Sequence, residues 1–134
     1  MRYIDAFNHF FPKRYYEALL ETPAAAKDLG KRVRGIPALS DLDMRLRIVD
    51  QFENYSQVLS HGLPPMERLW GPDKSPEMAK IGNDGLAEIV AKHPKQFVGY
   101  SALLPMNAPE AAAKEEAEEE AGPLAEPADV EVEE

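Results

Sequence analysis

Residues 4–12 of the chain are IDAFNHFFP, an apolar run that ends in His9 and is stopped by Pro12. Side chains alternate between the two faces of a strand, so Asp5, Phe7 and His9 are predicted to share one face. A His-x-His pair in this place would clip a metal ion between two imidazoles. Phe7 stands at the first of these two positions, so the run matches the pattern of a metal-binding strand in which one ligand is missing.

Strands and helices are predicted to alternate along the rest of the chain. Short runs rich in β-branched and aromatic residues predict strands near residues 3–8, 55–60 and 97–103. Apolar positions at helical spacing predict helices between them, over residues 12–20, 42–53 and 76–93, with Ser40 as the N-cap of the second. This β-α-β-α-β order favours a parallel sheet with right-handed crossovers.

Two long loops are expected after the first two strands. Residues 21–39 carry prolines and glycines among basic residues and are predicted to be an irregular loop with a short helix near residues 24–29. A second turn-rich loop begins at His61. In parallel α/β sheets the loops at the carboxyl ends of the strands carry the active site, and both His9 and His61 stand at such ends. Five aromatic residues are expected to pack between helices and sheet: Tyr3, Phe10, Phe11, Tyr15 and Tyr16.

The charge of the chain is concentrated at its C-terminal end. Residues 110–134 hold ten Glu, one Asp and one Lys, a net charge of −10, whereas residues 1–109 have a net charge of +1. We therefore predict a partial barrel over residues 1–108, followed over residues 109–134 by an acidic Ala/Glu-rich helix and a disordered tail.

Composition also excludes several classes of protein. The acidic total and the short basic run at residues 31–34 argue against nucleic-acid binding. No apolar run approaches the length of a membrane span, and no signal-peptide core is present, so a cytoplasmic location without membrane contact is expected. The absence of cysteine excludes disulfides and thiolate metal sites. Gly-rich phosphate loops, a Gly-x-Ser-x-Gly elbow and a His-Glu-x-x-His motif are also absent.

Three segments together resemble the amidohydrolase superfamily, in the branch of aminocarboxymuconate-semialdehyde decarboxylase and related aromatic-acid decarboxylases. The first is the run at residues 4–12. The second is DMRLRIVD at residues 43–50 followed by residues 57–60, which is similar to that branch's helix into strand two. The third is AKHPKQFVGY at residues 91–100, followed by Leu104-Pro105-Met106. The likeness covers about residues 2–114.

The resemblance implies a fold and a chemistry. The family has a (β/α)₈ TIM-type barrel of about 250 residues, with a divalent metal, zinc or manganese, held by the strand-one His-x-His pair and by residues on later strands. Its members are hydrolases or, in this branch, decarboxylases (carboxy-lyases) that act on a small carboxylated organic substrate. We therefore expect an α/β fold that contains the first three βα units of such a barrel, truncated, with the disordered acidic tail after them.

Each candidate site residue has a functional and a structural interpretation. The resemblance makes His9 a metal ligand, although a strand-end histidine hydrogen-bonded within the barrel mouth is the alternative. Asp5 is either a carboxylate that orients a neighbouring ligand or a buried structural residue. His61 belongs either to an active-site loop or to the surface. Arg32 and Arg34 either bind a substrate carboxylate or are solvated. No residue is assigned a catalytic role.

The leading hypothesis is the N-terminal portion of a metal-dependent amidohydrolase-type decarboxylase or hydrolase, inactive as this chain and without bound metal. A metal-dependent lactonase or amide hydrolase of the same superfamily is the alternative enzyme. A non-catalytic interaction module that uses a partial sheet and the acidic tail is the alternative from a different class. The sequence leaves the oligomeric state open, a homo-oligomer included.

Overall fold

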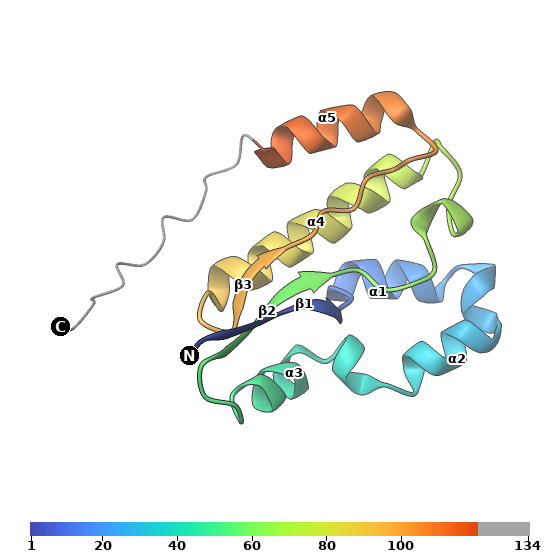
Figure 1. Cartoon of the computed structure of the whole chain (residues 1–134). Coiled ribbons are helices and arrows are strands. Elements are labelled where there is room, and N and C mark those ends of the chain that lie inside the picture. The colour runs from blue at the N-terminus through green and yellow to red at the C-terminus, as the bar shows by residue number, and fades with distance from the viewer. Residues whose placement is uncertain (121–134) are drawn as a thin grey trace.

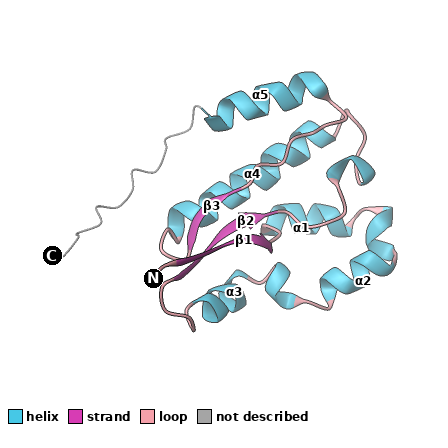
Figure 2. Ribbon diagram, in the orientation of Figure 1, coloured by secondary structure: helices cyan, strands magenta, loops and turns pink. Residues whose placement is uncertain are grey.

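The structure is a computed structural model that describes residues 1–120, without the side chains of residues 28, 29 and 118–120. Strands and helices alternate along the described chain (Figures 1 and 2). The strands are β1 (Tyr3–His9), β2 (Tyr55–Ser60) and β3 (Phe97–Tyr100). The α-helices are α1 (Lys13–Leu20), α2 (Asp28–Arg34), α3 (Leu42–Val49), α4 (Ser75–Lys92) and α5 (Pro109–Glu120). Three short 3₁₀ helices join them: η1 (Pro23–Ala26), η2 (Pro37–Leu39) and η3 (Met66–Arg68).

The three strands form one parallel sheet in the order β1-β2-β3. Tyr3 lies opposite Tyr55 at the start of the first pair, and His9 lies opposite Ser60 at its end. The register shifts between Asp5 and Asn8, so the middle of β1 departs from regular pairing. The predicted α/β fold with a parallel sheet is confirmed for the described residues.

Helices α3 and α4 pack on one face of this sheet. A core cluster joins Val49 of α3 and Leu86 of α4 to Leu59 of β2 and Phe97 of β3. Leu59 and Phe97 are fully buried. Successive strand residues alternate between faces, so Val58 points to the side opposite Leu59. The sheet is therefore covered by helices on the Leu59 side.

Helix α4 lies against the turns that leave β1 and β2, and two glycines allow this approach. A Cβ atom at Gly85 would lie 2.5 Å from Cβ of Pro12, and one at Gly82 would lie 2.9 Å from the His61 ring. Such distances are closer than any side chain permits. A second core cluster fills the space between α1, α2, η3 and α4, with Phe11, Tyr15 and Leu19 among its buried members. Among residues 1–120, no helix is both long and apolar enough to cross a membrane.

The prediction of an irregular loop over residues 21–39 was wrong. Helices η1, α2 and η2 occupy most of this segment. Val33 and Ala25 are buried in the second core cluster, and the absence of a side chain at Gly30 lets α2 pack on η1. Tertiary packing of these small and apolar residues thus overrides the loop-favouring prolines and glycines.

The helix predicted over residues 42–53 is shorter than expected. Its N-cap is Asp41, whose carboxylate accepts a hydrogen bond from Met44 N at 2.9 Å, and not Ser40. The helix ends at Val49, and Phe52 is 58% exposed instead of buried. Tyr3 is also exposed, at 59%, whereas Phe10, Phe11 and Tyr15 are buried as expected.

The third strand ends at Tyr100 and does not reach residue 103 as predicted. The buried side chain of Asn83 replaces the sheet bonds beyond that point: its Oδ1 accepts from Leu103 N at 2.7 Å, and its Nδ2 donates to Leu103 O at 2.9 Å. Asn83 Nδ2 also donates to Glu115 of α5, and α5 lies against α4 (Figure 1). The predicted disorder of the acidic tail concerns residues 121–134, which lie outside the described residues.

Candidate functional site

His9 ends β1 and is tied to the end of β2. Its Nδ1 lies 3.0 Å from Ser60 Oγ, and Ser60 Oγ donates to Asn8 O at 2.6 Å. A hydroxyl has one hydrogen, and Asn8 O takes it, so Ser60 Oγ accepts from Nδ1–H of His9. Nε2 of the neutral imidazole then keeps its lone pair. His9 therefore presents one nitrogen that can accept a proton or bind a ligand.

The backbone at His9 is held by Arg45 of α3, which sequence reasoning did not identify as a site residue. Arg45 is 6% exposed and donates to His9 O, to Gln57 Oε1 at 3.1 Å and to Asn8 Oδ1 at 3.3 Å. It also donates to Ala38 O at 3.0 Å. Burial lowers the pKa of Arg45, against the opposing effects of Tyr55 and Asp5, but an arginine remains charged. Arg45 thus joins α3, β1 and β2 at the histidine.

Asp5 and Phe7 precede His9 on β1, and their side chains contact different residues. Asp5 Oδ1 accepts from Phe7 N at 2.9 Å, and Asp5 Oδ2 accepts from Tyr55 OH at 2.9 Å. Phe7 is 85% exposed, and its ring meets the His9 ring edge to face at 5.4 Å between centroids. The predicted role of Asp5 as an orienting carboxylate stays a prediction, because its observed partners are Phe7 and Tyr55.

The described residues do not fit a divalent metal ion. Among residues 1–120, no group of three or more His, Asp and Glu side chains is placed to share one. Phe7 has no lone pair to donate, and the hydrogen-bond partners of the Asp5 carboxylate are Phe7 N and Tyr55 OH. Metal sites of this kind need three or four protein ligands. His9 Nε2 is one potential ligand without a second.

His61 follows β2, and its ring points into the helical layer. It packs against Tyr15 at 4.6 Å and Phe11 at 6.5 Å between centroids, and beside Gly82 of α4. Both ring nitrogens are buried and have no hydrogen-bond partner among the described residues. Burial disfavours the imidazolium and lowers the pKa of His61 to about 4. His61 is therefore packed among aromatic rings, whereas the His9 ring is hydrogen-bonded to Ser60.

The two arginines predicted to bind a substrate carboxylate lie on α2. Arg34 donates to Ala25 O at 3.1 Å and so holds α2 on η1. Arg32 is exposed on the same helix. Within residues 1–120, the hydrogen bonds of His9 go to Ser60 and Arg45 and not to either of these guanidinium groups. Substrate binding by Arg32 and Arg34 stays a prediction.

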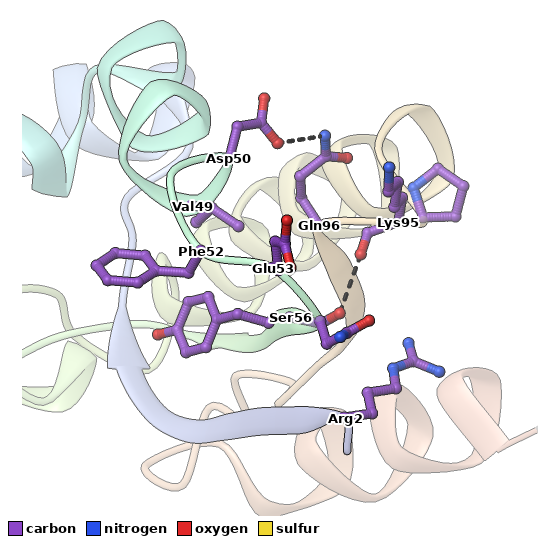
Figure 3. A pocket seen from close by; sticks show the side chains of 11 residues that line it. Arg2, Val49, Asp50, Phe52, Glu53, Ser56, Lys95 and Gln96 are labelled. Atoms are coloured by element: carbon purple, nitrogen blue, oxygen red, sulfur yellow. Dashed lines mark hydrogen bonds between the residues drawn. The ribbon is translucent and has the colours of Figure 1, made fainter.

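A cavity lies at the opposite end of the sheet from His9. It has a volume of about 730 Å³, and its lining includes Arg2, Phe52, Tyr55 and Gln96 (Figure 3). Gln96 Nε2 donates to Asp50 Oδ1 at 3.0 Å across its wall. Parallel α/β folds place their chemistry at the carboxyl ends of the strands, so this cavity at the amino ends is not the candidate active site.

Two residues that build the site were missed, and each carries a weak signal in the sequence. Arg45 falls in the helical register of Leu42, Leu46 and Val49, and a charged residue on an otherwise apolar face indicates a buried partner. Ser60 is the last residue of β2 and so aligns with the end of β1 in a parallel pair. Their partners on β1, Asn8 and His9, lie 36 to 52 residues away in the chain, so these contacts could not be predicted.

Removing the Ser60 hydroxyl tests the proposed tautomer of His9. In Ser60→Ala, Nδ1–H loses its acceptor, and we expect the Nε2–H tautomer to become the major form, at a stability cost of about 1 kcal/mol. Nitrogen chemical shifts of the His9 ring, measured by NMR at pH 8, report the tautomer. Ser101→Ala at the end of the neighbouring segment is the control. An unchanged His9 spectrum in Ser60→Ala would contradict the assignment.

Comparisons with known proteins agree with the fold. No protein-family model matches the chain. Gamma-resorcylate decarboxylase from Polaromonas sp. (strain JS666) is 40% identical over 73 residues, which are 54% of this chain and 22% of that protein. A second gamma-resorcylate decarboxylase, from Rhodococcus jostii (strain RHA1), is 36% identical over the same length.

Solved structures extend the likeness over most of the chain. 5-Carboxyvanillate decarboxylase from Sphingomonas paucimobilis has a TM-score of 0.67 and 25% identity, over 85% of this chain and 38% of that structure. 2,6-Dihydroxybenzoate decarboxylase from Rhizobium has a TM-score of 0.60 and 29% identity, over 86% and 34%, and its complex with 2,6-dihydroxybenzoate matches equally well. A putative amidohydrolase from Staphylococcus aureus has a TM-score of 0.57 and 31% identity, over 86% and 32%.

The chain spans about a fifth of the curated relatives it matches and about a third of the solved structures. The resemblance to the N-terminal portion of amidohydrolase-superfamily decarboxylases is confirmed by these likenesses. The three-stranded parallel sheet corresponds to part of their barrel fold.

Proposed function

We propose that this chain, which resembles the first βα units of amidohydrolase-superfamily decarboxylases, supplies one side of the active-site mouth of such an enzyme. One observation carries the proposal: His9 stands at the carboxyl end of β1, joined to the end of β2, in a sheet similar to that of 5-carboxyvanillate decarboxylase. The mouth of a barrel is where these strand ends converge.

The substrate class we propose is a carboxylated aromatic ring. The relatives are named for 5-carboxyvanillate, gamma-resorcylate and 2,6-dihydroxybenzoate, and each name denotes an aromatic acid. Decarboxylation breaks the ring-to-carboxylate bond, releases carbon dioxide, and leaves the electron pair on the ring carbon, which then takes a proton. We propose that His9 Nε2, which has a free lone pair, first takes a proton from water and then, as the imidazolium, gives it to the ring carbon.

By itself, the 134-residue chain is proposed to bind no divalent metal tightly and to turn over no aromatic acid. The basis is the ligand set at β1, where Phe7 has no lone pair and no three His, Asp or Glu side chains among the described residues are placed to share an ion. The purified chain should be supplied with zinc or manganese, dialysed, and assayed for bound metal and for carbon dioxide release from 2,6-dihydroxybenzoate. Stoichiometric metal together with turnover would contradict this proposal.

Restoring the missing imidazole is expected to create a metal site. In Phe7→His, two imidazoles on one side of β1 can approach one ion, because the Phe7 and His9 rings are 5.4 Å apart between centroids and zinc–nitrogen bonds are about 2 Å long. We expect zinc to bind about tenfold more tightly than to the unmodified chain, as measured by calorimetry at pH 7.5.

The matched control for this substitution is Phe52→His. Phe52 is also exposed, at 58%, but it lies at the amino end of β2, away from His9. Equal zinc affinity in both variants would show that Phe7 and His9 do not share a side of the strand in a usable geometry.

Hydrolysis of a lactone or amide is the alternative reaction, and the named relatives favour decarboxylation over it. Substrate profiling separates the two: release of carbon dioxide identifies a decarboxylase, and release of a new acid from a lactone or amide identifies a hydrolase. No observation on the described residues favours a non-catalytic module built on the acidic tail.

A further inference from the structure

Strand β1 contains one residue more than the stretch of β2 with which it pairs. Asp5 lies opposite Gln57, and Asn8 lies opposite Leu59, so three steps along β1 match two steps along β2. The extra residue makes a β-bulge at residues 6 and 7. A bulge of this kind changes the direction in which the side chains after it point.

The bulge decides which face of the sheet carries His9. Before the bulge, each β1 residue pairs with the β2 residue 52 positions later in the chain, and after it with the residue 51 positions later. If the first register continued, His9 would lie opposite His61 and would point to the same face as Leu59, which α3 and α4 cover. In the observed register His9 lies opposite Ser60 and points to the other face. The prediction that Asp5 shares a face with His9 is therefore wrong.

The side-chain amide of Asn8 holds the bulge in place. Its Nδ2 donates to Asp5 O at 3.1 Å, across the extra residue, and to Val58 O of β2 at 2.8 Å. Its Oδ1 accepts from Arg45 of α3 at 3.3 Å. An amide fits these partners in one orientation, because its nitrogen has two hydrogens for the two carbonyl oxygens and its oxygen accepts from the guanidinium. Asn8 thus joins both strands and α3 at the bulge.

We propose that Asn8 is a positioning residue for His9: by fixing the bulge, its amide directs the imidazole away from α3 and α4 and toward Ser60. The inference rests on the proposed function for the use that His9 makes of this direction. Asn8 acts through the backbone and through Ser60. The Ser60 hydroxyl donates to Asn8 O at 2.6 Å, so a shift of the backbone at Asn8 displaces the acceptor of His9 Nδ1–H.

Removing the amide tests this role. The variant Asn8→Leu nearly keeps the volume of the side chain but loses both donors and the acceptor, so the bulge should shift and the hydrogen bond between His9 and Ser60 should break. Nitrogen chemical shifts of the His9 ring, measured by NMR on the 134-residue chain at pH 8, report the outcome. We expect at least about half of the Nδ1–H tautomer to be lost. An unchanged His9 spectrum would overturn the positioning role.

A matched control separates positioning from stability. Asn107 also uses its whole amide: its Nδ2 donates to Trp70 O at 3.1 Å, and its Oδ1 accepts from Ser75 Oγ at 2.6 Å. Asn107→Leu should therefore lower the urea midpoint about as much as Asn8→Leu, but it should leave the His9 spectrum unchanged. If both variants changed the His9 spectrum equally, the cause would be a general loss of stability and the proposal would be wrong.

A second variant, Asn8→Asp, covers the case in which Asn8→Leu does not fold. Its carboxylate keeps an acceptor for Arg45 but has no hydrogen for Asp5 O and Val58 O. The His9 tautomer should therefore change as in Asn8→Leu, and an unchanged spectrum would contradict the proposal. None of these measurements depends on turnover. A failed decarboxylation assay would count against the proposed function and leave the positioning role standing, so the two claims fail separately.

Discussion

Replacing Arg45 by methionine is expected to lower the free energy of unfolding by about 3 kcal/mol, because it leaves buried acceptors without a donor. Arg45 supplies hydrogen bonds to Ala38 O, Asn8 Oδ1, Gln57 Oε1 and His9 O. Its guanidinium also lies over the Phe10 ring, 5.6 Å from the centroid. Methionine preserves the aliphatic volume but offers none of these contacts. Urea unfolding followed by circular dichroism at pH 7.5 measures the loss.

Two further variants make this prediction specific. Arg47→Met removes an exposed arginine from the same helix and should change stability by no more than about 0.5 kcal/mol. Arg45→Lys keeps the charge but has three donors in place of five, so it should fall between wild type and Arg45→Met. If Arg45→Met proved as stable as Arg47→Met, the bonds that join α3 to β1 and β2 would not hold the sheet.

Acidification is expected to destabilise the chain through His61. Burial lowers the pKa of His61 to about 4 in the folded chain, from 6.5 for a free histidine. Between pH 4 and pH 6.5, His61 binds a proton in the unfolded chain but not in the folded chain. The contribution of this difference to the free energy of unfolding is therefore fully present above pH 6.5 and is lost as the pH falls toward 4. The loss amounts to about 3 kcal/mol at about 1.4 kcal/mol per pKa unit.

The variant His61→Leu should remove this part of the pH dependence. Leucine cannot bind a proton and fills a site bordered by Phe11, Tyr15 and Gly82. Unfolding free energies at pH 7.5 and pH 4.5 should differ by about 2 to 3 kcal/mol less in His61→Leu than in wild type. His93→Gln removes another histidine and is the control; it should keep the loss caused by His61. A wild-type pH dependence in His61→Leu would refute the burial-based account.

Much of the architecture follows from local patterns. Pro12 and Pro76 stand beside the starts of α1 and α4, and the strands predicted near residues 3–8 and 55–60 correspond to β1 and β2. Helical periodicity did not predict the helices whose packing partners lie outside the local segment of sequence. The segment over residues 21–39 is mostly helical because Ala25 and Val33 are buried against α1 and η3, which no local window contains.

The candidate site also has some features that the sequence predicts and others that depend on tertiary contacts. The sequence places His9 at the predicted end of β1 and puts Phe7, which has no lone pair to donate, two residues before it. The tautomer of His9 is set by Ser60, and its backbone is held by Arg45, residues separated from it by 51 and 36 positions. The sequence left His61 either in an active-site loop or at the surface, whereas in the structure its ring packs beside Gly82, whose lack of a side chain leaves space for it on α4.

The sequence by itself determined the order of the βα units and the chemical identity of the groups on β1, because both depend on residue type and on short-range spacing. The tertiary structure alone decided which nitrogen of His9 is free, that the ring nitrogens of His61 are buried, and which face of the sheet α3 and α4 cover. Each of those properties depends on desolvation and on hydrogen bonds between distant segments, which exist only once the chain has brought them together.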